Sequence, residues 1–285
     1  MTTEICKLCN KQAKLIESHV ILKAIFRWLK NTSGTGLFRG GGKNRNKVQQ
    51  DGYKYRWLCN NCEQKFSIYE KYFMECIFKP VNNGIAVSSF DYDHKLFYFL
   101  SSVWWRIIHQ SLLETDVQEC GYLKEIYACE QELKDFLNNG NFPHTYSQNY
   151  LMLLGEIKRA PKHLQHLNFI FLRTVDPLLM FDKDSCYLSL RVPHFYFFLN
   201  ITGLHTKMLE AIALNPKGGH FQVSSQPMIE PHITSLISQR IITINSQKVS
   251  ENQIQKTTER HLKNMDKWLD SKSFDVWIKD RKREE

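Results

Sequence analysis

The chain has 285 residues, enough for one large domain or for a small module joined to a larger one. Hydrophobic residues make up 42% of it, so it can bury a core, but no stretch offers about 18 uninterrupted apolar residues, which excludes a transmembrane helix. The charge is uneven: residues 1–80 hold 15 Lys and Arg against 6 Asp and Glu, giving +9, whereas residues 81–285 hold 23 of each.

The excess positive charge therefore lies in the first 80 residues. A basic module on a neutral body indicates a polyanionic partner, most simply nucleic acid, although a merely basic surface is the alternative. The N-terminus, MTTEICKLC, lacks the basic and then apolar run of a secretion signal. We therefore expect a cytoplasmic protein that does not bind membranes.

Four of the eight cysteines form two CxxC pairs separated by 49 residues. Two CxxC turns can complete a tetrahedral shell of four thiolates, which suits Zn²⁺. The spacing predicts a structural zinc site; chance pairs of free thiols and a redox CxxC are the alternatives. The predicted ligands are Cys6, Cys9, Cys59 and Cys62.

The segment between the two pairs alternates between regular and irregular patterns. Residues 20–30 have apolar side chains at helical spacing, and residues 31–52 form a basic loop with six glycines. Residues 53–58 alternate like a strand, and a helix is expected from about Asn60 to Phe78, with Pro80 ending the unit. The loop carries four candidate nucleic-acid-binding residues, namely Arg39, Lys43, Arg45 and Lys47.

The rest of the chain, residues 81–285, predicts a mixed body. Helices are expected near 94–114 and 121–140. Strands are expected near 168–203, within 168–176 and 186–203, with a weaker one at 239–245 and a polar C-terminal helix after residue 250. The predicted fold class is α+β, with a zinc-bound module at 1–80 and an α+β body at 81–285.

With both cysteine pairs, the Ser18–His19 dipeptide and Glu63 after the last cysteine in view, residues 5–80 resemble the HNH endonuclease superfamily. The resemblance is to its zinc-containing branch, built as a ββα-metal or treble-clef unit. There, one CxxC precedes a strand ending in Asp-His, a second CxxC opens a helix, and Asn or His follows the last cysteine. Such a module hydrolyses phosphodiester bonds of DNA, with RNA as the alternative, and the resemblance suggests a role in antiphage defence.

The resemblance gives roles to three residues. His19 occupies the position of the general base that activates water. Ser18 stands where an Asp usually binds the catalytic Mg²⁺ or Mn²⁺, and Glu63 stands where Asn or His is a second ligand of that ion. The middle Asn of the motif has no clear counterpart. The carboxylate at Glu63 would replace the one lost at Ser18, since Mg²⁺ prefers oxygen ligands.

Two other functions stay open. The departure at Ser18 is also compatible with a non-catalytic zinc module that binds nucleic acid. A third interpretation is an interaction adaptor in which zinc is purely structural. In the endonuclease interpretation the α+β body would supply substrate choice, regulation or the surface for a protein partner or a second copy of the chain.

Overall fold

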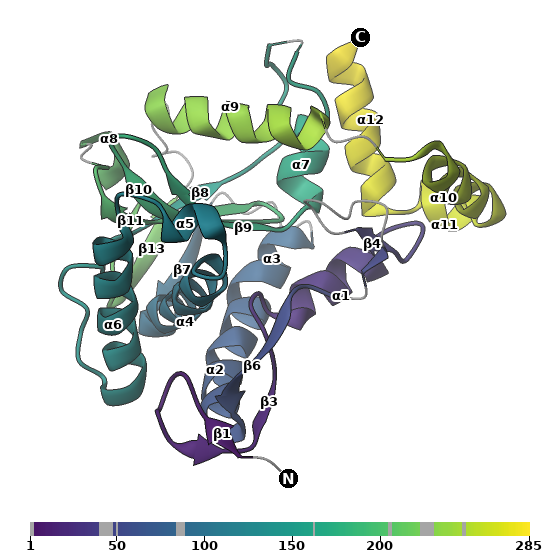
Figure 1. Ribbon diagram of the computed structural model, residues 1–285. Helices are drawn as coiled ribbons and strands as arrows, with labels where there is room; N and C mark the ends of the chain where they lie inside the picture. The colour runs from purple at the N-terminus through teal and green to yellow at the C-terminus, as the bar shows by residue number, and fades with distance from the viewer. Residues whose placement is uncertain are drawn as a thin grey trace.

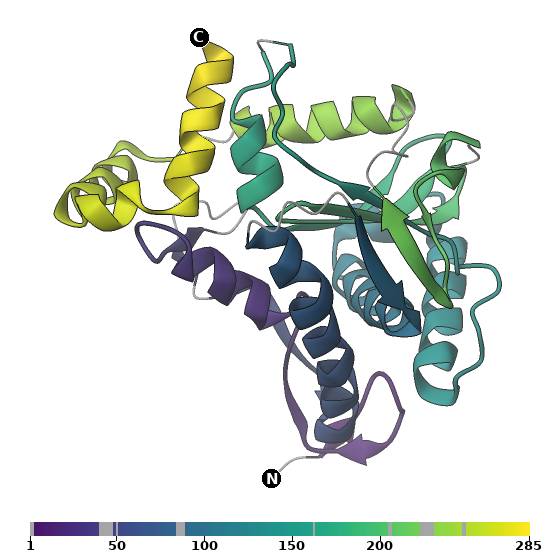
Figure 2. The same ribbon diagram turned by 180° about the vertical axis from the view of Figure 1, so that it is seen from behind.

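The computed structural model describes residues 3–39, 48–49, 51–83, 89–161, 163–204, 207–222, 231–246 and 249–285; at 38–39, 48–49, 207–208, 231–234 and 236 it describes the backbone alone. Helices and strands are mixed throughout, which confirms the predicted α+β class (Figures 1 and 2). In the described part of the chain, none of the helices has both the length and the apolar character needed to cross a bilayer.

The first part of the chain consists of two antiparallel strand pairs and two helices. Strands β1 (Glu4–Ile5) and β2 (Gln12–Ala13) form a short hairpin, and β3 (Leu15–His19) pairs with β6 (Lys54–Cys59). Helix α1 (Lys23–Asn31) follows β3, and β4 (Phe38–Arg39) pairs with β5 (Val48–Gln49) before β6. The predicted helix near 20–30 and strand near 53–58 are thus confirmed, shifted by a few residues.

A long helical segment follows β6. It consists of α2 (Asn60–Tyr72), the π-helical turn η1 (Phe73–Phe78) and α3 (Lys79–Asn82). The helix predicted from Asn60 to Phe78 is confirmed, but it continues past Pro80 to Asn82. Pro80 is the second residue of α3, directly after the π-helical turn, and has no backbone N–H to donate to that turn.

A five-stranded antiparallel sheet lies at the centre of the body. Its strands are β8 (Asn149–Leu153), β9 (Asp176–Phe181), β10 (Cys186–Val192), β11 (Phe195–Thr202) and β12 (Ala213–Leu214), in the order β12-β8-β11-β10-β9. Pro193 and His194, which has a φ of 68°, make the tight turn between β10 and β11. A separate pair joins β7 (Ser89–Asp93) to β13 (Gly218–Gln222).

Helices cover both faces of this sheet. Leu188 and Phe197 contribute to a core with α4 (His94–Ser111) and α6 (Leu123–Asn139), whereas Tyr187 and Phe198 contribute to a second core with α7 (Leu167–Arg173), α9 (Pro231–Ser246) and α12 (Lys272–Glu284). Because successive side chains of a strand point to opposite faces, the apolar run of β10 and β11 serves both cores. Along the chain, the short helix α5 (Thr115–Gln118) lies between α4 and α6, and the short helix α8 (Lys207–Glu210) lies between β11 and β12.

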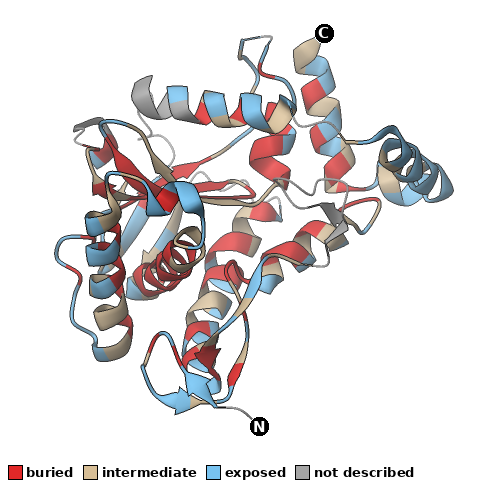
Figure 3. Ribbon diagram, in the orientation of Figure 1, coloured by how far each residue is buried: buried red, intermediate tan, exposed pale blue. Residues whose placement is uncertain are grey.

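Helix α4 joins the two parts of the molecule. Its residues from Leu96 to Ile108 are all buried, including Trp104 and Trp105, and Figure 3 shows the helix largely buried. The first core includes Cys6 and Phe66 from the N-terminal part together with Phe197 from the sheet. One continuous apolar core therefore links the cysteine-bearing part to the body.

The strand expected at 168–176 is instead helix α7, and β9 begins only at Asp176. Leu167, Ile170 and Phe171 lie at helical spacing and pack into the second core. Asp280 of α12 accepts hydrogen bonds from the backbone N–H groups of Asn168 (2.9 Å) and Phe169 (2.8 Å) at the start of the helix. A cap contributed from a distant helix is not visible in the local sequence.

The strand expected at 239–245 is part of helix α9. Its β-branched residues favour a strand locally. Ile237, Ile241 and Ile244, however, recur at i, i+4 and i+7 and pack against the second core, which decides for the helix. Packing therefore overrides the local preference.

The polar C-terminal helix is divided into three: α10 (Glu251–Lys263), α11 (Met265–Leu269) and α12. Asn264 leaves the helical conformation with a φ of −128°. The Ser271 side chain then caps α12 by accepting from the Phe274 N–H at 3.1 Å. Both breaks reflect residues that favour caps over helix interiors.

Candidate metal centre and the residues beside it

The two cysteine pairs come together as predicted. The sulfur atoms of Cys6, Cys9, Cys59 and Cys62 all lie within 4.8 Å of one another. The Sγ–Sγ distances are 3.8 Å for Cys6 and Cys62 and 3.9 Å for Cys9 and Cys59. A tetrahedral zinc with Zn–S bonds of about 2.3 Å requires sulfur atoms about 3.8 Å apart, so the four thiols fit zinc.

Local structure positions each pair. Cys6 and Cys9 flank the turn between β1 and β2, which a hydrogen bond from Asn10 N to Cys6 O (2.9 Å) closes. The Lys7 N–H donates to Trp57 O (2.8 Å) and attaches this turn to β6. Cys59 ends β6 and Cys62 lies in the first turn of α2. The β1–β2 turn thus contributes two thiols and the junction of β6 with α2 contributes the other two, and all four thiols lie close together.

The thiols ionise unequally in the absence of an ion. Burial opposes ionisation of Cys6, but hydrogen bonds from the backbone of Cys9, Cys59 and Leu8 outweigh it and lower the pKa of this thiol to about 7. Burial raises the pKa of Cys9 and of Cys62. Metal binding deprotonates coordinating thiols, so a bound Zn²⁺ would complete the ionisation that Cys6 begins.

Ser18 and Glu63 are in contact. The Ser18 hydroxyl, 1% exposed, donates a hydrogen bond to Oε2 of Glu63 in the first turn of α2. The β3–β6 register shifts between Ile16 and Ser18, and such a bulge changes the direction of the following side chains. The structure therefore brings together the two predicted oxygen ligands.

His19, the last residue of β3, is held by a partner that the sequence did not reveal. Its Nε2 lies 3.0 Å from Oδ2 of Asp51, and the two side chains are 15% and 11% exposed. Burial raises the pKa of Asp51, but the hydrogen bond to His19 and the charges of His19, Lys54 and Lys23 outweigh it, so the pKa is lowered. Asp51 is therefore an ionised carboxylate that fixes the orientation of the His19 ring.

Arg106 of α4 binds the C-terminal end of β3. It is 1% exposed, and its Nη1 lies 2.8 Å from both the backbone oxygen of His19 and Oε1 of Glu70. Arg106 thereby also pairs with Glu70 of α2. The body thus positions His19 through its backbone, as Asp51 does through its ring.

The structure thus forms two pairs, Ser18 with Glu63 and His19 with Asp51. Within the described residues, no hydrogen bond or ion pair joins His19 to Glu63, and the four cysteines are the one group of three or more Cys, His, Asp or Glu side chains close enough to share an ion. The Ser18–Glu63 pair offers a hydroxyl and a carboxylate, which are hard oxygen donors suited to Mg²⁺ or Mn²⁺. It would need further oxygen atoms from water and substrate.

The predicted nucleic-acid-binding side chains fall outside the described part of the chain. Lys43, Arg45 and Lys47 are not described, and Arg39 is described through its backbone in β4 alone. Around the candidate site, Lys23 and Lys54 are the cations nearest Asp51, at 4.0 and 3.7 Å. Neither was singled out from the sequence.

Comparison of the chain with protein families, with curated proteins and with solved structures found no match.

Proposed function

We propose that the chain is an HNH-like, metal-dependent endonuclease that hydrolyses phosphodiester bonds of DNA. The observation that carries the proposal is the hydrogen bond between His19 and Asp51. In the chain, His19 directly follows Ser18 of the Ser18–Glu63 pair, and Glu63 directly follows Cys62 of the four-cysteine cluster. An oriented imidazole and oxygen donors for a divalent ion are groups that this hydrolysis requires.

The order of elements supports an HNH-like unit. A cysteine-bearing turn between β1 and β2, the antiparallel pair β3–β6 and a helix that opens with the second cysteine pair follow one another, with α1 inserted within the pair. This order is compatible with a ββα-metal or treble-clef module. Zinc at the four cysteines would be structural, because four thiolates leave no open position for substrate.

In the proposed reaction, His19 is the general base. It accepts a proton from water, the water oxygen bonds to phosphorus, and the bond from phosphorus to the leaving oxygen breaks. Asp51 would hold the ring and stabilise the imidazolium that forms. Asp51 is thus a positioning residue.

Glu63 and Ser18 would hold the catalytic ion. A bound Mg²⁺ or Mn²⁺ supplies a Lewis acid for the phosphate and the leaving oxygen. The Ser18 hydroxyl donates to Oε2 of Glu63 and so fixes the carboxylate that would bind the ion. Negative charge at this site is thereby contributed from α2 rather than from β3.

The positive charge of residues 1–80 supports a polyanionic substrate. Cations such as Lys23 and Lys54 at the candidate site, with Arg39, Lys43, Arg45 and Lys47 of the glycine-rich segment, would contact phosphates. Contacts of this kind are independent of base sequence and weaken as salt increases. RNA is the alternative substrate, and a role in antiphage defence rests on the resemblance alone.

A second candidate function is a non-catalytic zinc module that binds nucleic acid. The observation that favours it concerns Ser18, whose hydroxyl donates its hydrogen bond to Glu63. A neutral hydroxyl contributes no charge to a metal site. In that case the fold would be kept while the chemistry is lost.

A cleavage assay separates the two functions. Plasmid and single-stranded substrates are incubated with the zinc-loaded chain and Mg²⁺ or Mn²⁺, and the parent is compared with His19→Ala and Glu63→Ala. We expect divalent-dependent cleavage, lowered about 10²- to 10⁴-fold in His19→Ala and lost in Glu63→Ala. Glu75→Ala, which removes an exposed carboxylate of the same helical segment, is the matched control. Salt-sensitive binding without cleavage by the parent would establish the second function instead.

A further inference from the structure

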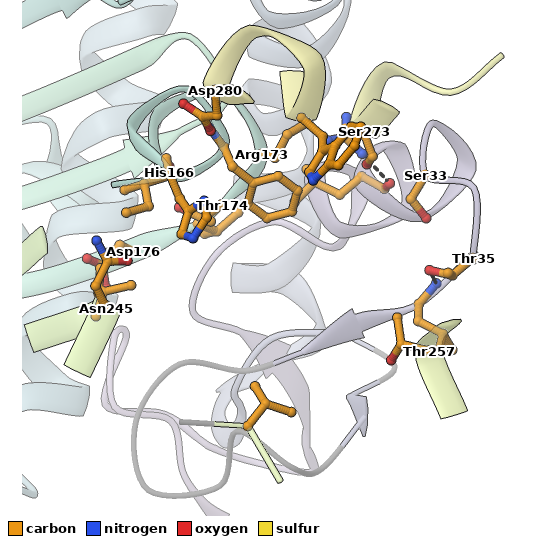
Figure 4. Close-up of a pocket in the computed structure, with 18 of the residues that line it drawn as sticks. Ser33, Thr35, His166, Arg173, Thr174, Asp176, Asn245, Thr257, Ser273 and Asp280 are labelled. Atoms are coloured by element: carbon orange, nitrogen blue, oxygen red, sulfur yellow. Dashed lines mark hydrogen bonds between the residues drawn. The ribbon is translucent and has the colours of Figure 1, made fainter. Parts of the chain in front are cut away.

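A cavity of about 500 Å³ lies where α1, α7, α9 and the C-terminal helices α10, α11 and α12 meet (Figure 4). Its lining includes none of the cysteines and none of Ser18, His19, Asp51 and Glu63. Cavities of about 300–1,000 Å³ with largely apolar walls and a few polar groups are typical of small-molecule sites. The proposed nuclease chemistry leaves this cavity without a role.

On one side of the cavity, two arginine side chains donate hydrogen bonds to the same carboxylate, that of Asp176. Asp176 accepts from Arg191 at 3.1 Å and from Nε and Nη2 of Arg240 at 3.0 and 2.8 Å. Within the described residues, Nη1 of Arg240 and Nε of Arg191 make no hydrogen bond. Two guanidinium groups against one carboxylate leave an excess positive charge on this wall.

Arg173 lines the cavity as well and adds a third guanidinium. It is 6% exposed and donates to two neutral acceptors, Leu29 O at 2.9 Å and Thr32 Oγ1 at 2.8 Å. Among the described residues no carboxylate pairs with it, and its Nε has no hydrogen-bond partner. Burial lowers its pKa to about 10, so it is still charged at neutral pH. Arg173 also lies over the Trp28 ring, 5.1 Å from its centroid, so no anion among the described residues balances its charge. A buried cation without a carboxylate partner on a cavity wall favours an anionic ligand.

Asp280, the other carboxylate of the lining, does not offset this charge. It accepts from the backbone N–H groups of Asn168 and Phe169 and from the Asn168 side chain, and so caps α7. Arg283 lies 3.9 Å from it. Its charge is therefore compensated by the helix N-terminus and by its own neighbour.

Aromatic rings from the C-terminal helices complete the walls. Trp268 of α11 stacks on His261 of α10 with a centroid distance of 4.0 Å, and Trp277 of α12 and Phe169 of α7 are 40% and 39% exposed. In Figure 4, Asp176 and Asn245 lie on one side of the view and Thr35 and Thr257 on the other, with Arg173 and Thr174 between them. Gly34 allows the wall to close here, because a Cβ would come within 2.6 Å of the Trp268 Cα.

We propose that this cavity binds a mononucleotide, with its phosphate at Arg173, Arg191 and Arg240 and its base against Trp268 and Trp277. Guanidinium groups bind phosphate oxygens through paired hydrogen bonds. Planar bases stack on indole rings without regard to base identity. The proposal concerns ligand binding and does not depend on nuclease activity.

The test is calorimetric titration of the full-length, zinc-loaded chain with AMP, GMP, CMP and UMP, beside adenosine and inorganic phosphate. We expect saturable binding of at least one mononucleotide, at least about 10-fold tighter than adenosine or phosphate alone. Arg240→Gln should weaken it about 10-fold or more, while Asp176 keeps Arg191 as its partner. Trp277→Ala should weaken it about 5-fold or more by removing a stacking surface.

Arg159→Gln is the matched control, since Arg159 is exposed and does not line the cavity. It should bind as the parent does, and circular dichroism should show that all variants keep the parent's fold. If Arg240→Gln does not fold, Trp277→Ala carries the test. The proposal is wrong if no mononucleotide binds the parent at millimolar concentration, or if the folded cavity variants bind as tightly as the parent.

Discussion

Asp51 is the hydrogen-bond partner of His19, the candidate general base that the sequence predicts. It lies 32 positions from His19, in the glycine-rich segment, and no spacing rule links the two. In the structure His19, Lys54 and Lys23 surround it, and its pKa is lowered although burial raises it. The candidate base thereby gains the carboxylate partner that general bases commonly require.

Replacing Asp51 by Asn should lower kcat for nucleic-acid cleavage about 10- to 100-fold and leave KM nearly unchanged. The amide oxygen still accepts the hydrogen bond, but the charge that stabilises the imidazolium is gone. Steady-state kinetics on a short duplex measures both constants. Asp91→Asn, which alters an exposed carboxylate beside His220, is the control. An unchanged kcat would exclude Asp51 as a positioning residue.

Arg106 is expected to contribute to the stability of the fold. Replacing it by Met leaves the Glu70 carboxylate and the His19 carbonyl without their donor, so the free energy of unfolding should fall by about 3 kcal/mol. Urea denaturation measures the change. Lys79→Ala removes an exposed ion pair with Glu75 and should cost under about 1 kcal/mol. Equal costs for the two variants would contradict the supporting role of Arg106.

At the scale of elements, the hairpin of β1 and β2 has little apolar packing of its own, whereas β3 and β6 contribute Leu15 and Leu58 to the first core. β1 and β2 have two residues each, and all of these residues are exposed or half-buried. So small a hairpin is marginal by itself. Zinc at its turn would fix it to the start of α2, which places Ser18 against Glu63.

We therefore expect one zinc ion per chain in elemental analysis, and its loss in Cys9→Ser. The thermal midpoint of Cys9→Ser should fall, because zinc binding contributes directly to folding. Cys76→Ser is the matched control, since Cys76 is exposed and lies outside the cluster. Full zinc content in Cys9→Ser would disprove the four-cysteine site.

At the scale of the whole molecule, the shared core decides how the chain unfolds. The first core runs from Cys6 through α4 to Phe221 and crosses the predicted boundary at residue 80. We expect tryptophan fluorescence and far-UV circular dichroism to give coincident urea transitions. Two separated transitions would show instead that residues 1–80 and 81–285 are independent folding units, as a module joined to a body would be.

Features that depend on residue spacing and composition could be predicted without the structure. The two CxxC pairs predicted the cysteine cluster, and the periodicity of 94–114 and 121–140 predicted α4 and α6, because ligand spacing and helical period are local properties.

Tertiary structure alone decided the remainder. Residues 168–173 and 239–245 became helices through packing and through the distant cap of Asp280, Asp51 was brought to His19, and three arginines from α7, β10 and α9 were gathered around one cavity. Contacts between residues far apart in the chain follow from how layers pack, and no local pattern encodes them.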